Sequence, residues 1–404
     1  MESSEAVQDR TVSVTARNDL ILLSLALALS QTGVMLYLTV AALTGFGLAD
    51  NKSLATLPLA LQFVSMAAGA FVVALAMRRY GRRPVFLLGQ LIGALSALLA
   101  AVCALQGSFT GFCIATLGLG IHNATWQHYR FAAIEQAPPV WRSRAIGLVL
   151  SGGVLAALIG GPLANWSQGL LLKLYAGTYL TVAALCLLTA LLLLKSRLRV
   201  RRSPARGAQR SLRQIAAQPG FALAVWVGAI GFAAMAFIMN STPLAMRLYG
   251  FASSDSNWVI QLHTLGMFAP SFVTGRLVRR FGSRSTAALG IVCFLVAVSI
   301  NLAGVDKLNF AAALLLLGVG WNLMFVSATD MLADSYRPED AERAQALNDT
   351  LLFSVVAGSN LLAGFLLELH GWQWVNLMVV GPMLLTLVFV LWRRERVVVL
   401  GERG

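Results

Sequence analysis

Long apolar stretches constrain the fold of this chain more strongly than any sequence motif does. A stretch of about 20 apolar residues is long enough to cross the hydrocarbon core of a bilayer as a helix. Twelve such stretches follow one another: 19–44, 55–77, 84–106, 109–134, 144–170, 175–194, 220–247, 255–277, 285–304, 308–334, 343–368 and 373–392. The sequence therefore predicts an all-α membrane protein with 12 transmembrane helices.

The composition argues against a soluble globular protein. Of 404 residues, 58% are hydrophobic and 12% are charged, whereas soluble domains are about 25% charged. The first twenty residues are polar and charged, so we expect no cleaved signal peptide and a cytoplasmic N-terminal tail. We find no Walker, Rossmann, HExxH or nucleophile-elbow pattern, and the chain is not expected to be an enzyme.

The net charge of +14 reflects topology, because the basic residues occupy alternate loops. Cytoplasmic loops of membrane proteins carry an excess of Lys and Arg. Arg-rich loops follow the second, fourth, sixth, eighth and twelfth spans, around residues 78–83, 142–144, 195–213, 276–284 and 393–396. This pattern predicts that both termini are cytoplasmic, and it removes the argument for a nucleic-acid partner.

The two halves of the chain echo each other across a basic linker. The motif RYGRR at 79–83 recurs as RFGSR at 280–284, and LGLG at 117–120 recurs as LGVG at 317–320, at offsets of 201 and 200 residues. Parallel repeats of six helices occur in secondary transporters. We therefore predict a cytoplasmic tail (1–18), an N-terminal six-helix half (19–194), a basic cytoplasmic linker (195–219), a C-terminal six-helix half (220–392) and a C-terminal cytoplasmic tail (393–404).

These loops resemble the motif that follows helices 2 and 8 in the major facilitator superfamily, and Gly160-Gly161-Pro162 resembles its helix 5 motif. The resemblance implies a transporter that alternates access by moving its two halves. The chain departs from the pattern at one place. Arg78 and Arg279 stand where the superfamily usually has an aspartate, three residues before the loop glycine, so a gating salt bridge through that aspartate is not expected.

Two side-chain pairs on the seventh and eighth spans suggest a soft metal site. Met235 and Met239, like His263 and Met267, are spaced i,i+4 and share a helix face. In antiparallel helices the two pairs match in depth. Thioethers favour Cu(I), and ionisable residues inside spans usually face a cavity. The alternatives are methionines that fill an apolar core and a structural histidine bonded to a neighbouring helix.

The surrounding sequence resembles the CcoA-type copper importers of the same superfamily. Similar runs are MAFIMNSTPLAM at 235–246, WVIQLHTLGMFAPS at 258–271, GVGWN at 318–322 and RAQALND at 343–349, which resemble that family's helices 7, 8, 10 and 11. The resemblance implies copper import, as Cu(I), across the bacterial inner membrane for assembly of a cytochrome oxidase. It implies that the copper ligands are Met235, Met239, His263 and Met267, and that copper is the transported substrate, not a permanently bound cofactor.

Three further polar residues are candidates for coupling or for lining the cavity. His122 and Asn123 lie midway along the fourth span, where structural hydrogen bonding is an equal alternative. Asp330 lies near the cytoplasmic end of the tenth span, where a gate or helix-end salt bridge is the preferred interpretation. Proton coupling through these residues and uniport driven by the membrane potential both remain open.

Two alternative functions also remain open. One is a proton-coupled facilitator of a small organic solute, with the methionines lining its cavity. The other is a membrane scaffold or sensor that transports nothing. The expected partners are copper ion, membrane lipid and copper chaperones, and we expect a monomer in the inner membrane. The four cysteines form no CxxC pair and are interpreted as small buried hydrophobes.

Overall fold

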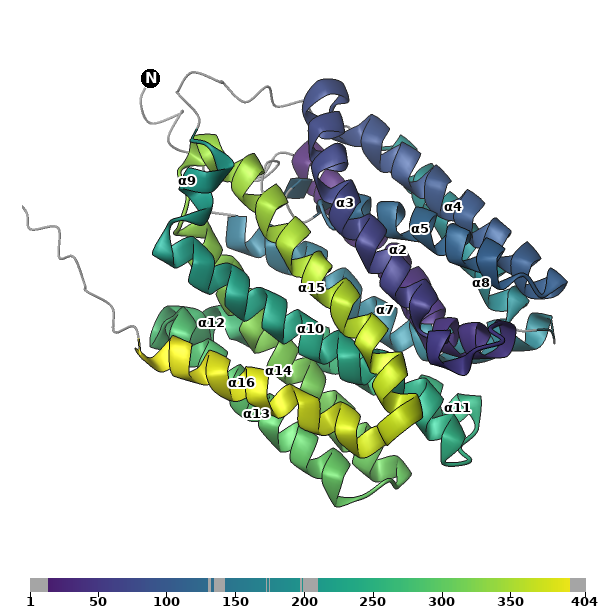
Figure 1. The fold of residues 1–404 in the computed structure, drawn as a ribbon. Coiled ribbons are helices and arrows are strands. Elements are labelled where there is room, and N and C mark those ends of the chain that lie inside the picture. The colour runs from purple at the N-terminus through teal and green to yellow at the C-terminus, as the bar shows by residue number, and fades with distance from the viewer. Residues whose placement is uncertain are drawn as a thin grey trace, which may run out of the picture.

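The computed structural model describes residues 14–129, 132–133, 142–171, 173, 175–196, 198 and 210–392, and all regular secondary structure within them is helical (Figure 1). The predicted N-terminal tail before residue 14, the C-terminal tail and linker residues 197 and 199–209 lie outside the described residues. The described elements of the first half are α2 (Val14–Leu48), η1 (Lys52–Leu54), α3 (Leu57–Tyr80), α4 (Arg82–Gln106), α5 (Phe109–Trp126), α7 (Arg142–Leu170) and α8 (Ala176–Leu194).

The second half follows the linker with a similar succession of helices. Its described elements are α9 (Leu212–Ala216), α10 (Pro219–Leu248), α11 (Ser253–Phe268), α12 (Ser271–Phe281), α13 (Ser283–Ala303), α14 (Lys307–Ala333), η3 (Pro338–Asp340), α15 (Ala341–His370) and α16 (Trp372–Trp392). The predicted span 255–277 is interrupted, because Ala269 and Pro270 separate α11 from α12. A proline lacks the N–H that would continue the backbone ladder.

Nine helices in the described part of the chain are long and apolar enough to cross a membrane. They coincide with nine of the predicted spans. The other three predicted spans correspond to α5, α7 and the interrupted pair α11–α12, which are not among those nine. The all-helical membrane class is thus confirmed, whereas the total of 12 spans stays a prediction.

The loop motifs adopt the same conformation in both halves. Gly81 ends α3 and starts α4 with φ +84°, and Gly282 ends α12 and starts α13 with φ +83°. Positive φ at these joints is readily adopted only by glycine. The arginine before each aromatic residue lies over its ring, with Arg79 5.2 Å from the Tyr80 centroid and Arg280 5.3 Å from that of Phe281. The sequence echo therefore corresponds to a repeated local structure.

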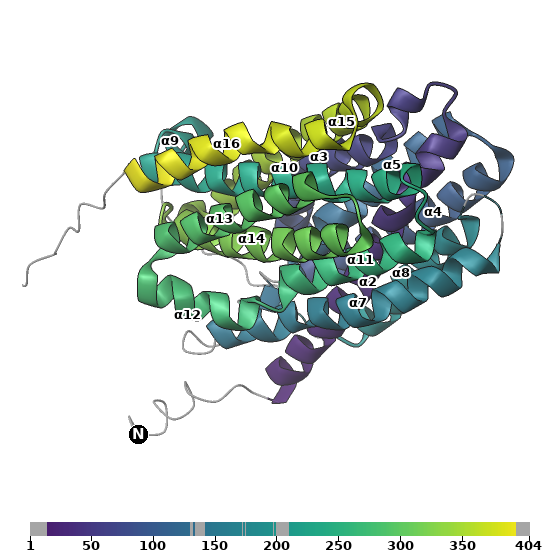
Figure 2. The same ribbon diagram turned by 90° about the horizontal axis from the view of Figure 1, so that it is seen from below.

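Helices of the first half pack directly against helices of the second. Figure 1 shows α15 lying beside α3, and Figure 2 shows α7 beside α11. Hydrogen bonds cross this interface from Thr56 Oγ1 to the Asn360 carbonyl at 2.9 Å and from Gln261 Nε2 to the Leu158 carbonyl at 3.2 Å. The Asn257 amide also donates to Asn165. Thr56 immediately precedes α3 and Asn257 lies near the start of α11, and both helices begin at the end of the bundle remote from α9 (Figure 1).

The topology can be tested by cysteine labelling in a background without native cysteines. We expect Ser203→Cys, in the linker, to resist a membrane-impermeant maleimide in intact cells, because the Arg-rich loops face the cytoplasm. Ser254→Cys, at the start of α11 and therefore on the opposite side, is expected to react. Labelling of Ser203→Cys in intact cells, with Ser254→Cys protected, would invert the predicted orientation.

Candidate functional site

Aromatic side chains from both halves meet at their interface. Phe63 on α3 lies 6.5 Å from the ring of Phe353 on α15 and 6.3 Å from Phe232 on α10, measured between centroids. On α14, Trp321 stacks on Phe325 at 4.7 Å with an interplanar angle of 12°, and Trp321 lies 5.6 Å from Phe232. We call these five residues the interface aromatic cluster. Its flat rings pack against one another at the junction of the two halves, and Phe63, Phe353 and Trp321 are buried.

One polar atom in this cluster is left without a partner. The indole Nε1 of Trp321 is buried and has no hydrogen-bond partner among the described residues. A buried tryptophan usually finds an acceptor for this N–H. The interface aromatic cluster therefore combines stacking surfaces with one free hydrogen-bond donor. The members of this cluster are dispersed over four helices, so no local sequence pattern reveals them.

The four predicted copper ligands are all buried in the second half. Met235, Met239 and Met267 belong to one apolar core cluster, and His263 is fully buried. Helix α11, which carries His263 and Met267, packs mainly against α14 and, across the interface, α7. The structure thus places the two predicted pairs in the interior of the protein.

The hydrogen bonding of His263 fixes which ring nitrogen is free. Its Nδ1 lies 2.8 Å from the Leu314 carbonyl oxygen, which can only accept, so Nδ1 carries the proton. In the neutral ring, Nε2 then keeps its lone pair. This atom is buried and has no hydrogen-bond partner among the described residues. Metal-binding histidines characteristically donate their other ring N–H to a carbonyl or carboxylate in this way.

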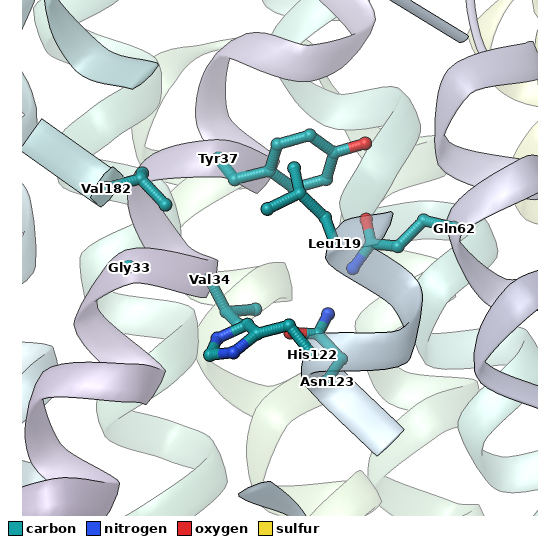
Figure 3. A pocket seen from close by; sticks show the side chains of 8 residues that line it. All are labelled: Gly33, Val34, Tyr37, Gln62, Leu119, His122, Asn123 and Val182. Carbon is teal, nitrogen blue, oxygen red and sulfur yellow. The ribbon is translucent and has the colours of Figure 1, made fainter. Parts of the chain in front are cut away.

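A small pocket lies within the first half, and we call it the N-terminal polar pocket (Figure 3). Polar groups of Tyr37 on α2, Gln62 on α3, and His122 and Asn123 on α5 share it with apolar walls. Its full lining is Gly33, Val34, Tyr37, Gln62, Leu119, His122, Asn123 and Val182. The structure therefore brings the predicted cavity residues His122 and Asn123 together with Tyr37 and Gln62, which the sequence analysis missed.

His122 and Asn123 are already hydrogen-bonded. The Nδ1 of His122 lies 3.1 Å from the Gly89 carbonyl oxygen, so this nitrogen donates, and Nε2 faces Cys186 Sγ at 3.9 Å. The Oδ1 of Asn123 accepts from Trp126 Nε1 at 3.0 Å. These bonds hold both side chains in place as walls of the pocket. His122 and Asn123 therefore form structural hydrogen bonds and also line a cavity, the two roles that the sequence left open.

Close glycine contacts position the polar residues of both halves. A Cβ at Gly120 of α5 would collide with the Gln62 carbonyl oxygen, and one at Gly318 of α14 would collide with the His263 carbonyl oxygen. Gly118 instead faces Ser96 of α4. The sequence match of Gly118 with Gly318 is therefore corrected, because the residue with the equivalent contact is Gly120.

The equivalence of Gly120 and Gly318 relates the N-terminal polar pocket to the predicted copper ligands of the second half. Gln62 and His263 occupy equivalent positions, separated by the 201 residues that also separate the loop motifs. Met66, one turn after Gln62, then corresponds to Met267. Applying the loop offset to the H-x₃-M pair is the signal that could have identified Gln62 from sequence.

Asp330 lies away from both sites. It is exposed near the end of α14, where its carboxylate accepts a hydrogen bond from the Ser283 hydroxyl at the start of α13. Burial, and then the charge of Asp330, raise the pKa of Asp334 above its usual value. Asp330 therefore lies at a helix end, where its partner is a hydroxyl and not the cation of the expected salt bridge.

Two packed bundles with a buried polar and aromatic interface define a membrane carrier. The sequence profile of the Major Facilitator Superfamily matches residues 20–357, with a second match over 227–402, and the chain belongs to this superfamily. It is therefore a multi-pass transporter of the secondary class.

Among its relatives, the riboflavin transporter RfnT of Brucella anthropi is 36% identical over 382 residues, which cover 94% of this chain and 96% of the relative. The uncharacterized MFS-type transporter YddS of Bacillus subtilis is 27% identical, covering 89% of this chain and 87% of the relative. Among solved structures, the human organic anion transporter MFSD10 shares the fold with a TM-score of 0.67 at 17% identity, over 94% of this chain and 100% of that one. The copper-importer subtype gains no support from these relatives.

The glycine contact yields a stability prediction. Gly120→Ala should lower the melting temperature of the purified protein, because the new methyl group must push α5 away from the Gln62 carbonyl. Gly381→Ala in α16 is the matched control, since a Cβ there meets no atom within 4 Å. Equal melting temperatures for the two variants, measured by size-exclusion thermostability, would contradict the close approach of α5 to α3.

Proposed function

We propose that this chain is a secondary transporter of a flat, aromatic organic solute of the flavin class. The observation that supports this most is the interface aromatic cluster, in which Trp321 and Phe325 form a stacked pair that Phe232 joins to Phe63 of the other half. The relative with 36% identity over nearly its whole length is named as a riboflavin transporter. The organic-solute alternative of the sequence analysis is thereby preferred to copper import.

The chemistry of such a solute suits this interface. A fused heteroaromatic ring has two large faces that lose little by leaving water and that stack on Trp and Phe. Its rim carries carbonyl and N–H groups, which need partners when buried. The described aromatic rings supply the first requirement, and the unpartnered Trp321 Nε1 supplies one donor toward the second.

Transport proceeds by alternating movement of the two halves about this interface. The expected location is the bacterial inner membrane, with 12 spans and cytoplasmic termini, as the charge distribution predicts. No step of this cycle requires a bound cofactor. A solute held by residues of both halves links their movement to its own passage, because each half contributes part of the binding surface.

Copper import remains the second candidate, and one observation favours it. His263 Nε2 is buried, unpartnered and unprotonated in the neutral ring, and Met235, Met239 and Met267 belong to the apolar core cluster of the same half. A neutral imidazole nitrogen and thioethers are ligand types that Cu(I) prefers. In this candidate the cargo supplies cytochrome oxidase assembly, as the family resemblance implies.

Riboflavin uptake by cells that lack other flavin transporters tests the main proposal. Trp321→Ala should raise the half-saturation concentration roughly 5- to 150-fold, the equivalent of the about 1–3 kcal/mol that one aromatic stacking contact contributes. Trp321→Phe, which keeps a stacking face, should remain within a few-fold of the parent.

Trp226→Ala is the matched control, because Trp226 packs on Phe389 and donates to Thr386 of α16, away from the interface aromatic cluster. It should transport normally. Normal uptake by Trp321→Ala at equal expression would remove the cluster from the solute path. Absence of riboflavin uptake by the parent protein would refute the proposed solute.

Copper accumulation by the same cells tests the second candidate. If copper is the cargo, the parent raises cellular copper, and the double variant Met235→Ala, His263→Ala abolishes the rise because two of four ligands are lost. Met378→Ala is the control, since that methionine is 45% exposed on α16. Cells with the parent protein that hold no more copper than cells without it exclude this candidate.

A further inference from the structure

The backbone ladder of the eighth predicted span is interrupted where α11 ends and α12 begins. Before the break, the Ala269 N–H donates back to the Leu265 carbonyl at 2.8 Å. After it, Val273 and Thr274 both donate to the Pro270 carbonyl, at 2.8 Å each. Pro270 has no N–H to donate. Among the described residues, no backbone hydrogen bond therefore joins α12 directly to α11.

One side chain of α14 joins the two helices across this break. The Asn322 amide donates to the Met267 carbonyl of α11 and to the Ser271 hydroxyl of α12, both at 2.7 Å. Its Oδ1 accepts from the Thr274 hydroxyl at 2.6 Å. A proline inside a membrane helix is tolerated where neighbouring helices satisfy the backbone groups that it frees. The buried Asn322 does this here, and it replaces the ladder that Pro270 interrupts.

The first half is unbroken at the equivalent place. Pro270 follows Gly69 by the 201 residues that separate the loop motifs, and α3 runs from Leu57 to Tyr80 without interruption. The register established for α5 and α14 pairs Asn322 with Ala124. A Cβ at Gly69 would lie 3.6 Å from the Ala124 Cβ, so these two small residues also face each other. The break is therefore a feature of the second half alone, with its own compensating amide.

The helices on the two sides of the break are held differently. α11 lies tightly against α14, because a Cβ at Gly266 would collide with the Leu315 carbonyl oxygen. In α12, Thr274 and Val278 are the buried residues, and the aromatic side chain of Phe272 is exposed. A segment with few buried contacts changes its position at lower cost than a closely packed one.

We propose that α12 bends about this break during the transport cycle, and that Asn322 is the positioning residue that holds the hinge. Figure 2 shows α12 at the end of the bundle where α9 lies, and α12 contacts α7 of the first half. Its movement therefore opens or closes a contact between the halves at the predicted cytoplasmic end. The inference rests on the proposed transport cycle, but not on the identity of the solute.

The hinge adjoins the interface aromatic cluster. Asn322 directly follows Trp321 in α14, and the ring of Phe268, the last residue of α11, lies 6.4 Å from that of Trp321. A Cβ at Gly153 of α7 would collide with the Phe268 ring, so this ring also packs on the first half. A solute that stacks on Trp321 thus acts one residue away from the amide that holds the hinge.

Distances within each half test the hinge without any solute. In a background without native cysteines, spin labels at Arg276 of α12 and Val296 of α13 report the position of α12, because α13 packs against α14 and α16. Leu75 of α3 and Leu95 of α4 are the matched pair at the offset of 201 residues, and all four side chains are exposed. In nanodiscs we expect a broad or two-peaked distance distribution for 276–296 and a single narrow one for 75–95.

Pro270→Ala tests whether the break serves transport. The new N–H can bond the Gly266 carbonyl, so the 276–296 distribution should narrow to one distance. The maximal rate of riboflavin uptake should fall about fivefold, because each bend now breaks one more backbone hydrogen bond, while the half-saturation concentration stays unchanged. Pro382→Ala is the matched control, since α16 continues through that proline, and it should change neither measurement.

Asn322→Leu separates positioning from structural support. It should broaden the 276–296 distribution further and lower the melting temperature, since the Met267 carbonyl loses its partner. The double variant Pro270→Ala, Asn322→Leu should recover part of the melting temperature, because a continuous helix satisfies that carbonyl itself, and should keep the low uptake rate. Recovery of both would show that Asn322 only supports the fold. Pro270→Ala decides the question even if Asn322→Leu fails to fold.

The outcomes separate this inference from the proposed function. Equal widths for the two label pairs of the parent protein would mean that the second half is as rigid as the first, and they would overturn the hinge. A Pro270→Ala protein with the distances and uptake of the parent would also overturn it. A parent that carries no riboflavin refutes the proposed solute, and the distance measurements, which need no solute, still decide the hinge.

Discussion

The scarcity of water inside a membrane protein is the constraint on which the rest of this structure depends. Backbone and side-chain polar groups there must find partners within the protein, so helices form and polar side chains pair. Most buried polar residues here obey this, as Asn322 does by donating to the Met267 carbonyl at 2.7 Å and accepting from Thr274 Oγ1 at 2.6 Å. Some buried polar atoms have no hydrogen-bond partner among the described residues. Among them, Trp321 Nε1 lies in the interface aromatic cluster, and Tyr37 Oη and Gln62 Oε1 line the N-terminal polar pocket inside the first half.

The contacts between halves describe one state of a transport cycle. Thr56 bonds Asn360, and Asn257 bonds Asn165, at the end remote from α9, while aromatic rings meet further along α3 and α15. With the predicted topology, this end faces outward, and a further hydrogen bond from Thr350 Oγ1 to the Ala67 carbonyl, at 3.2 Å, joins α15 to α3 nearer the cytoplasmic side. These few hydrogen bonds must break for the opposite state to form. Each contributes only about 0.5–1.5 kcal/mol, which a solute bound between the halves can offset.

Much of the architecture could be predicted from sequence, and the limits have physical causes. Apolar length located the helices, and the glycine of the RYGRR and RFGSR motifs located two joints whose positive φ requires it. The register of the internal repeat was less secure, since LGLG can be aligned with LGVG in more than one way. Only contacts show that Gly120 and Gly318 correspond. The i,i+4 pairs drew attention to His263, whereas Gln62 at the equivalent position carries no charge. The interface aromatic cluster joins four helices, and tertiary proximity of that kind leaves no local pattern in the chain.

The central claim is that a flat aromatic solute stacks within the interface aromatic cluster. Flavin fluorescence measured with purified protein tests this most directly, because a stacked indole quenches an excited flavin. The account predicts that riboflavin fluorescence falls on binding to the parent protein. It also predicts that Trp321→Phe retains binding by equilibrium dialysis while most of the quenching disappears. Riboflavin that binds with equal quenching in both proteins, or that does not bind the parent at all, would contradict the account.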